Sequence, residues 1–394
     1  MLPLGYQFAG VYCGIKRNPN KLDLTLVHSK TPAVAAGVYT QNLVYAAPVA
    51  VDRDRTPSDH VRTVVINSGN ANACTGERGT ADALRMAELA AKACGTEPES
   101  ALVMSTGIIG EFLPMEKIEK GIADAAGRLA GDEASFDAAA RGILTTDTTK
   151  KVASRTCVLG GREIRLVGFA KGAAMIGPNM ATMLGLLLTD ASLTSESAQR
   201  LLRKAADETF NCISVEGHMS TNDTVLLLAN GKAGGAPLEG LDEAAFSEAI
   251  TEVCAELAKA IPEDGEGVSH VITITVSGLK TKEDARQIAK TVAESALVKT
   301  AVAGADPNWG RIVSAAGYAG VPFDTAKLAL HVNGILLFDA GAPVKFDAKA
   351  VSASIRENRE TVIDLKFHEG NERIRFWTTD LTAEYVRLNA DYHT

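Results

Sequence analysis

The uncharged segment that follows Lys171 carries a residue suited to covalent chemistry. It leads through Pro178 to Thr182, which stands among small and apolar residues. Pro178 fixes its own φ angle, and residues 183–188 are apolar enough to be buried. The Thr182 hydroxyl would therefore be held rigidly and partly away from water, where a base could turn it into a nucleophile. The alternative is that this hydroxyl only hydrogen-bonds a neighbouring carbonyl group in the core.

The familiar metal and nucleotide motifs do not occur in the sequence. There is no P-loop, no glycine-rich dinucleotide motif after a strand, no HExxH, no EF-hand loop and no GxSxG. The seven histidines and six cysteines are dispersed, without the short spacings of metal ligands. We therefore expect no metal and no resident cofactor.

Length and composition are those of a folded protein with an acidic balance. The 394 residues are 46% hydrophobic and 22% charged, with a formal net charge of −8. This composition supplies a core, and the negative charge argues against nucleic acid as a partner. The scattered cysteines indicate a reducing compartment, and the N-terminus lacks the basic start of a signal peptide. Gly177-Pro178-Asn179 would break a membrane helix, so we expect a cytoplasmic protein without a membrane segment.

Helix and strand patterns alternate along the chain, which predicts an α/β or α+β fold. Asn333-Gly334 predicts a hairpin turn within 327–338. The turn cluster at 262–267 favours a domain boundary near 270–285, followed by a C-terminal domain at 285–394. Strands are predicted at 22–27, 33–39, 61–67, 101–104, 164–169, 271–276, 362–366 and 374–377, and helices at 80–94, 115–129, 136–144, 194–206, 241–261, 281–296 and from 382.

Ten short blocks in the same order as in a known family extend from one end of the chain to the other. Together they resemble the ornithine acetyltransferases, also called bifunctional glutamate N-acetyltransferases. Any single block is weak evidence, but their order makes the resemblance specific. The blocks are 14–16, 36–40, 46–49, 67–75, 105–110, 145–148, 171–185, 264–267, 306–311 and 389–394.

The resemblance implies a layered α/β fold of the N-terminal-nucleophile type and self-cleavage between Ala181 and Thr182. The products would be chains 1–181 and 182–394, which stay together as an α2β2 heterotetramer. Cleavage gives Thr182 a free α-amine, and such an amine has a pKa of about 7.7–8.0, which suits a general base near neutral pH. Thr182 would take acetyl from N-acetylornithine, release ornithine, and pass the acetyl group to glutamate to form N-acetylglutamate. This ping-pong reaction belongs to arginine biosynthesis.

The family's site residues carry over to matching positions. The oxyanion of the tetrahedral intermediate would be held by the Thr106 hydroxyl and the Gly107 backbone N–H; the alternative is that Ser105-Thr106-Gly107 is only a turn after a strand. Lys171 could pair with a substrate carboxylate and Glu266 with a cationic amine. The implied substrate contacts are Thr145, Lys171, Thr182, Glu266, Asn389 and Thr394, each of which could instead be a polar loop residue without a ligand.

Two other functions fit the same residues. Water in place of glutamate as acceptor would make the chain an N-terminal-nucleophile amidase or aminopeptidase. A non-catalytic amino-acid-binding protein would show neither cleavage nor an acyl group on Thr182. Within the leading interpretation, acetyl-CoA as a second acetyl donor and feedback inhibition by ornithine or arginine are left open by the sequence.

Overall fold

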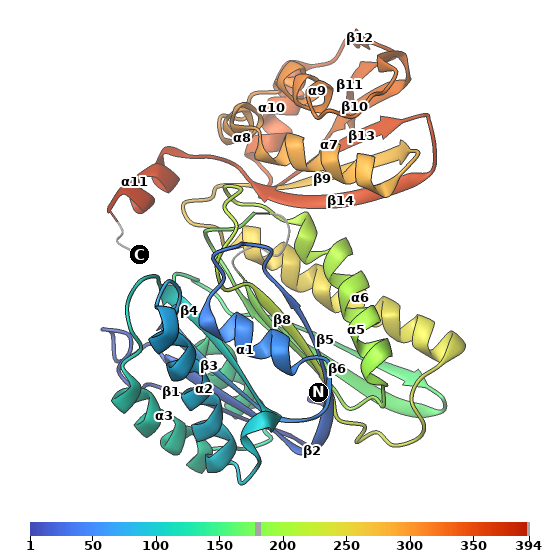
Figure 1. Cartoon of the computed structure of the whole chain (residues 1–394). Helices are drawn as coiled ribbons and strands as arrows, with labels where there is room; N and C mark the ends of the chain where they lie inside the picture. The colour runs from blue at the N-terminus through green and yellow to red at the C-terminus, as the bar shows by residue number, and fades with distance from the viewer. Residues whose placement is uncertain (178–182, 392–394) are drawn as a thin grey trace.

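The computed structural model describes residues 1–177 and 183–391, which form two β-sheets with helices packed on them (Figure 1). The first sheet contains β1 Tyr6–Val11, β2 Leu24–Tyr39, β3 Ser58–Asn70, β4 Ala101–Ile108, β5 Lys151–Leu159, β6 Arg162–Lys171, β7 Leu184–Thr189 and β8 Thr224–Ala229. Its helices are α1 Ala47–Arg55, α2 Gly76–Ala93, α3 Met115–Gly127, α4 Glu133–Gly142, α5 Ser195–Glu208 and α6 Gly240–Glu263, with short 3₁₀ turns at Pro98–Ser100 and Phe210–Cys212. The predicted α/β class is confirmed.

The long strand β2 joins the two halves of this sheet. The strand order is β4-β3-β2-β8-β7-β6-β5, and β1 also pairs with β2. The N-terminal part of β2 pairs with β3, whereas Val34 to Tyr39 pair with β8. Its register with β3 is irregular between His28 and Ala35, where the sequence had predicted a break between two separate strands. A single irregular strand thus replaces the two predicted ones.

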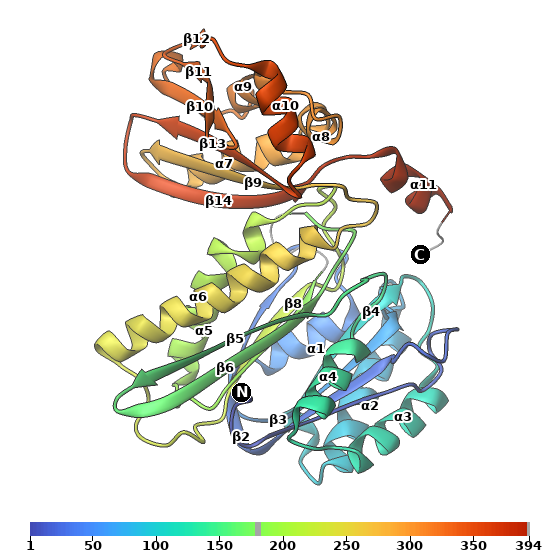
Figure 2. The same cartoon turned by 180° about the vertical axis from the view of Figure 1, so that it is seen from behind.

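Buried side chains divide the first domain into four layers. One apolar cluster joins α2 and α3 to β1–β4, and another joins α5 and α6 to β5–β8. Between them lies a third cluster, in which Phe136 of α4 makes edge-to-face contacts with Phe8 at 5.1 Å and Phe169 at 5.6 Å between ring centroids. Figure 2 shows α5 and α6 on one side of the strands and α2 and α3 on the other. The order is therefore helix, strand, strand, helix.

The second sheet has the strand order β12-β11-β10-β13-β9-β14. Its strands are β9 Val271–Leu279, β10 Leu328–Val332, β11 Ile335–Asp339, β12 Ala342–Pro343, β13 Glu360–Phe367 and β14 Glu372–Thr379. Its helices are α7 Lys282–Glu294, α8 Ala296–Ala303, α9 Trp309–Gly317 and α10 Ala348–Arg356, with a 3₁₀ turn at Thr325–Lys327; the tail forms α11 Ala383–Asp391. The chain passes from the first sheet to the second between the end of α6 at Glu263 and the start of β9 at Val271. The sequence predicts a boundary near 270–285 and a C-terminal domain from residue 285.

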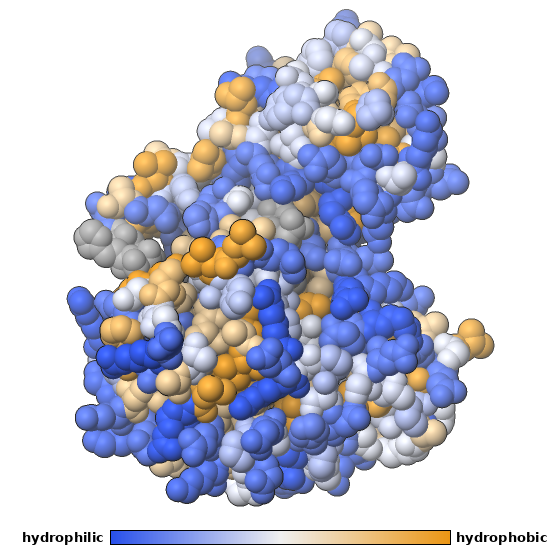
Figure 3. Space-filling model, in the orientation of Figure 1, coloured by the Kyte–Doolittle hydropathy of each residue, from blue (hydrophilic) through white to orange (hydrophobic). Residues whose placement is uncertain are grey.

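Local signals in the second half of the sequence agree with the structure. Thr194 and Thr281 each cap a helix, accepting hydrogen bonds from the backbone N–H groups of Ser197 and Asp284. Asn333 and Gly334 both have positive φ, as a two-residue hairpin turn requires, and they join β10 to β11. On the face of the molecule shown in Figure 3, polar residues separate the apolar areas from one another. Across the described residues, no helix is long and apolar enough to cross a membrane.

The middle layer offers a stability test. Phe169→Ala removes a fully buried ring from the contact between the two halves of the first sheet. We expect the free energy of unfolding to fall by about 3–5 kcal/mol, because the cavity adds to the lost transfer energy. Chemical denaturation of the purified protein measures this change. Leu241→Ala, at a position 90% exposed, is the control and should cost less than about 0.5 kcal/mol; equal losses for the two variants would contradict the layer assignment.

Candidate active site

The ends of strands from the two halves of the first sheet meet at Lys171 and Thr106. Lys171 is the last residue of β6, and it pairs across the sheet with Leu184, the first residue of β7. Its side chain is buried, and its Nζ donates a hydrogen bond to the Thr106 Oγ1 at 3.1 Å. Thr106 is itself buried near the end of β4. The structure therefore places a predicted oxyanion donor beside the lysine that leads into the Thr182 segment.

Gly107 needs to be glycine for two reasons. Its φ of 136° lies in the region that L side chains rarely adopt. A Cβ at this position would also lie 2.2 Å from the carbonyl carbon of Gly69 and 2.4 Å from the Asn70 nitrogen. The backbone of β4 thus packs directly on the end of β3, which leaves the face of Gly107 without a side chain, as the predicted oxyanion role requires.

A buried chain of alternating charges connects this point to the loop after α6. Asp147 receives hydrogen bonds from the Gly172 N–H at 2.7 Å and the Thr145 N–H at 3.0 Å. The Lys151 ammonium bridges Asp147 at 2.7 Å and Asp264 at 2.6 Å, and all three side chains are almost inaccessible to water. Thr145, a predicted substrate contact, is therefore held by its neighbour Asp147.

These charges shift one another's pKa values. Burial lowers the pKa of Lys171, and the nearby Asp147 carboxylate partly opposes that effect. Burial alone would raise the pKa of Asp147, but the ammonium groups of Lys151 and Lys171 outweigh it and hold this pKa well below its ordinary value. Asp147 is therefore ionised throughout the neutral range and supplies the negative charge that a buried ammonium group needs.

The C-terminal helix contacts the loop after α6, near the other end of the site. The Asn389 side chain of α11 donates to the Glu266 Oε2 at 3.2 Å, and the Glu266 N–H donates to the Ala173 carbonyl at 3.2 Å. Gly267 packs against the backbone of Tyr385, where a Cβ would lie 2.5 Å from the nitrogen. The predicted contacts Glu266 and Asn389 therefore meet, next to the loop that follows Lys171.

Three predicted residues fall outside the described part of the chain. They are the cleavage pair Ala181 and Thr182 and the C-terminal Thr394. Among the residues that the structure does describe, no group of three or more histidine, cysteine or acidic side chains could hold a metal ion.

Sequence reasoning missed Asn222 and Asp223, which precede β8. The Asn222 side chain donates to the Ala71 carbonyl at 2.6 Å and the Ser105 carbonyl at 2.8 Å, and so fixes the residue before Thr106. Asp223 accepts a hydrogen bond from the Met183 N–H at 2.9 Å. Their partners lie 40 to 151 positions away in the chain, so no local spacing could have revealed them.

The comparisons with known proteins agree with this arrangement. A family model described as the ArgJ family matches residues 7–394. The chain belongs to the ArgJ family. The arginine biosynthesis bifunctional protein ArgJ of Rhodopirellula baltica is 46% identical over 397 residues, which cover 100% of this chain and 97% of that protein. The crystal structure of ArgJ from Bacillus halodurans is 37% identical, covers 52% of this chain and 96% of that chain, and has a TM-score of 0.50.

The ArgJ assignment confirms the family resemblance seen in the sequence motifs. With it, the predicted activity class is confirmed: this ArgJ protein is an acyltransferase of arginine biosynthesis. The relative from Symbiobacterium thermophilum, 45% identical over 100% of this chain and 98% of that protein, carries the same name.

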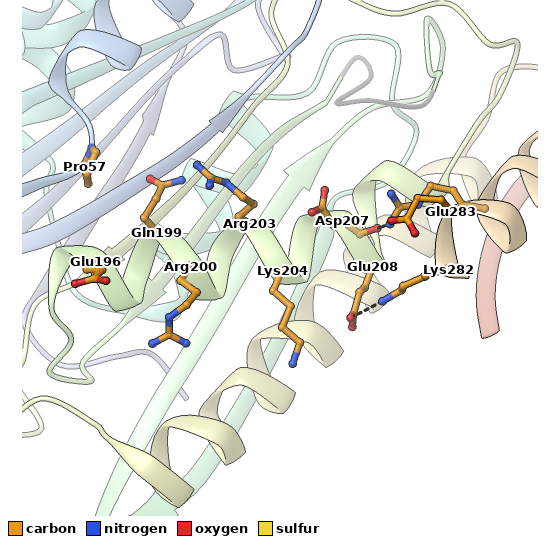
Figure 4. A pocket seen from close by; sticks show the side chains of 11 residues that line it. Pro57, Glu196, Gln199, Arg200, Arg203, Lys204, Asp207, Glu208, Lys282 and Glu283 are labelled. Atoms are coloured by element: carbon orange, nitrogen blue, oxygen red, sulfur yellow. Dashed lines mark hydrogen bonds and ion pairs between the residues drawn. The ribbon is translucent and has the colours of Figure 1, made fainter. Parts of the chain in front are cut away.

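A separate groove of about 840 Å³ runs along α5 towards α7 (Figure 4). Its lining is mostly charged, and Lys282 and Glu208 form an ion pair across it at 2.6 Å. None of the site residues carried over from the family lines this groove. The groove is therefore separate from the strand ends around Lys171, where the predicted site residues lie.

Removing the central cation of the buried charge chain should be costly. Lys151→Met leaves Asp147 and Asp264 without their shared ammonium group, and we expect the free energy of unfolding to fall by about 3–5 kcal/mol. The neighbouring Lys150 pairs with Asp137 at the surface. Lys150→Met should therefore cost no more than about 1 kcal/mol. Denaturant unfolding of both variants at neutral pH compares them, and similar losses would show that the buried network is not specific.

Proposed function

We propose that this chain transfers an acetyl group from N-acetylornithine to glutamate through an acetyl ester on Thr182, after cleaving itself between Ala181 and Thr182. The observation that supports this most directly is the hydrogen bond from Lys171 Nζ to Thr106 Oγ1. Lys171 also pairs across the sheet with Leu184, two residues after Thr182. This contact links Thr106, the proposed oxyanion donor in one half of the sheet, to the strand of the other half that leads into the Thr182 segment.

The first half of the reaction needs a base and an acceptor for negative charge. The α-amine of Thr182 takes the hydroxyl proton as the oxygen attacks the acetyl carbonyl carbon, and the amide nitrogen of N-acetylornithine leaves as the amine of ornithine after receiving a proton. In the second half, the amine of glutamate attacks the acetyl ester. The ester bond breaks, the Thr182 oxygen regains a proton, and N-acetylglutamate leaves.

The contact with Lys171 explains how Thr106 can act as a donor. Because the Thr106 oxygen accepts the hydrogen bond from Lys171, its own hydrogen is free to point towards a substrate oxygen. A cation behind the hydroxyl also strengthens it as a donor. Together with the Gly107 N–H, this gives the two donors that a tetrahedral oxyanion requires. A direct contact between Lys171 and a substrate carboxylate stays a prediction.

The charges around the site suit an amino acid that carries both signs. Glu266 offers a carboxylate to the cationic amine of ornithine, and Asn389 holds the other side of this carboxylate. Thr145 lies on the loop fixed by Asp147. Contact of these residues with substrate, the use of acetyl-CoA as a second donor, and the α2β2 assembly stay predictions.

Intact mass and an acetyl-transfer assay test the proposed function together. The wild type should give two species, one ending at Ala181 and one starting at Thr182, whereas Thr182→Ala should remain one inactive chain. The assay follows N-acetylglutamate formed from N-acetylornithine and glutamate, with and without acetyl-CoA. Loss of N-acetylornithine without N-acetylglutamate would indicate an amidase, and an uncut but active wild type would overturn the role of the α-amine.

Thr106→Val should remove one oxyanion donor while keeping the shape of the side chain. We expect kcat to fall by about 10²–10³-fold with little change in KM, because the hydroxyl acts mainly in the transition state. Thr106→Ser keeps the hydroxyl and is the control, with most of the activity retained. If the valine and serine variants are equally active, Thr106 is not an oxyanion donor.

Glu266→Gln should weaken ornithine binding by about tenfold, because it removes a charge without changing the shape of the side chain. Calorimetric titration of the cut enzyme with ornithine measures the affinity. Glu263→Gln, which changes an exposed carboxylate at the end of α6, serves as the control and should bind ornithine like the wild type. Unchanged affinity in Glu266→Gln would count against an ion pair at this position.

A further inference from the structure

One chain segment, residues 215–224, holds the described residues on both sides of the predicted cleavage site. On the earlier side, the carbonyl of Ile176 accepts hydrogen bonds from the Val215 N–H at 2.9 Å and the Gly217 N–H at 3.1 Å, and its N–H donates to the Glu216 side chain. Gly177 packs so closely on Gly217 that a Cβ would lie 2.5 Å from its carbonyl carbon. These contacts therefore fix the chain as far as Gly177, on the earlier side of the predicted cleavage site.

The later side is held by Asp223 and Thr224. The Met183 N–H donates to the Asp223 Oδ1 at 2.9 Å, and the Met183 carbonyl accepts from the Thr224 N–H at 3.1 Å. Met183 directly follows Thr182 in the chain. Asp223 therefore binds the peptide group whose carbonyl carbon belongs to the predicted nucleophile.

Two buried carboxyl groups, those of Glu216 and Asp223, thus bind the described residues on the two sides of the predicted cleavage site. Their surroundings differ. Glu216 lies near the ammonium of Lys299, which itself makes four hydrogen bonds to its neighbours. Glu216 also holds Ile176, which would belong to the other product after cleavage. Both carboxyl groups belong to residues 182–394, but only Asp223 binds the residue that directly follows Thr182.

Asp223 is fully buried. Within residues 1–177 and 183–391, its Oδ2 has no hydrogen-bond partner. The charged side chain that acts on it is Lys171 of β6, while Thr40 and Ser220 supply hydroxyl groups. Burial raises the pKa of Asp223 well above its ordinary value, since Lys171 only partly compensates. A second cation close to this carboxyl group would therefore be stabilising.

We propose that Asp223 is a positioning residue for the nucleophile, which holds the Met183 N–H with one oxygen and provides the counter-charge for the α-ammonium of Thr182 with the carboxylate as a whole. The inference rests on the proposed function, because only a cut chain has this amine. Cleavage adds water across the peptide bond: Ala181 gains a carboxylate, and Thr182 gains an amine that can bind a proton.

Covalent geometry brings the two charges together. The nitrogen atoms of Thr182 and Met183 are separated by three bonds and lie no more than about 3.7 Å apart. Met183 N is 2.9 Å from Asp223 Oδ1, so the chain itself limits how far the amine can be from this carboxyl group. A nearby carboxylate favours the protonated amine, so it raises the amine's pKa. The stronger base accepts the hydroxyl proton of Thr182 more readily, at the cost of activity at lower pH.

The pH dependence of kcat/KM tests this effect in the cut enzyme. Its acidic limb reports the amine, which must be unprotonated to act as the base. Asp223→Asn keeps an oxygen for the Met183 N–H but removes the negative charge, so the amine's pKa should fall and the acidic limb should move to lower pH by about one unit. N-acetylornithine and glutamate are the substrates, and intact mass confirms that each sample is cut.

Asp52→Asn is the matched control. Asp52 is also fully buried, also accepts a backbone N–H through Oδ1, from Val103, and also has an Oδ2 without a partner among the described residues, but it lies on α1. Its acidic limb should match the wild type. A cut and folded Asp223→Asn enzyme with the wild-type limb would overturn the inference while leaving the proposed function intact, whereas an uncut wild type would overturn both.

A second measurement uses the wild type alone, in case Asp223→Asn is not cut. The rate at which acetic anhydride modifies the α-amine of the chain starting at Thr182 is followed by mass across a pH series. We expect the amine to titrate above the ordinary 7.7–8.0 of a free α-amine. Titration at or below this range would show that Asp223 does not act as its counter-charge.

Discussion

Burying the ammonium group of Lys171 costs free energy, because a charge loses its water shell when it enters the interior. The structure offsets this cost with a neutral acceptor, Thr106, and with the negative charge of Asp147. Asp147 in turn is held by Lys151 and by the Gly172 N–H, and Lys151 reaches Asp264. Two ammonium groups and two carboxylates thus neutralise one another in one buried network. Their attraction holds the loops that carry these side chains in place. The hydrogen bond from Lys171 fixes the position of Thr106, the proposed oxyanion donor, within this network.

The same constraint explains why the first sheet has two layers. Thr106 lies near the end of a strand of one half, whereas Lys171 ends a strand of the other. They come within hydrogen-bonding distance because β2 passes from one half to the other. Asn222 reinforces the contact by binding the carbonyl groups of Ala71, just after β3, and Ser105, within β4. The apolar cluster around Phe136 fills the space between the layers. A single flat sheet could not bring these strand ends together.

The sequence could predict what local chemistry decides. The caps at Thr194 and Thr281 and the turn at Asn333-Gly334 depend on a few neighbouring residues, and the structure contains all three. Strand pairing was harder: the predicted strands 362–366 and 374–377 flank a turn, but β9 lies between β13 and β14. Helix α1 was missed, since nine residues that begin with Ala-Pro show little apolar periodicity. In the site, family motifs indicated Thr106 and Lys171, but the partners Asn222 and Asp223 are distant in the chain and carry no local signal.

The connection between β6 and β7 is longer than the fold alone requires. These strands are antiparallel neighbours, paired from Leu166–Thr189 to Lys171–Leu184, and a turn of about two to five residues commonly joins such a pair. Here residues 172–183 make the connection. Strand pairing and the core include residues from before and after the Ala181–Thr182 bond, as β2 pairs with β8 and Phe169 shares a cluster with Leu186. A break within the connection would leave these hydrogen bonds and contacts in place, and it would remove only the loop constraint, a small entropic term. The stability of the fold therefore comes mainly from the paired strands and the core. The connection can be cut without loss of these contacts.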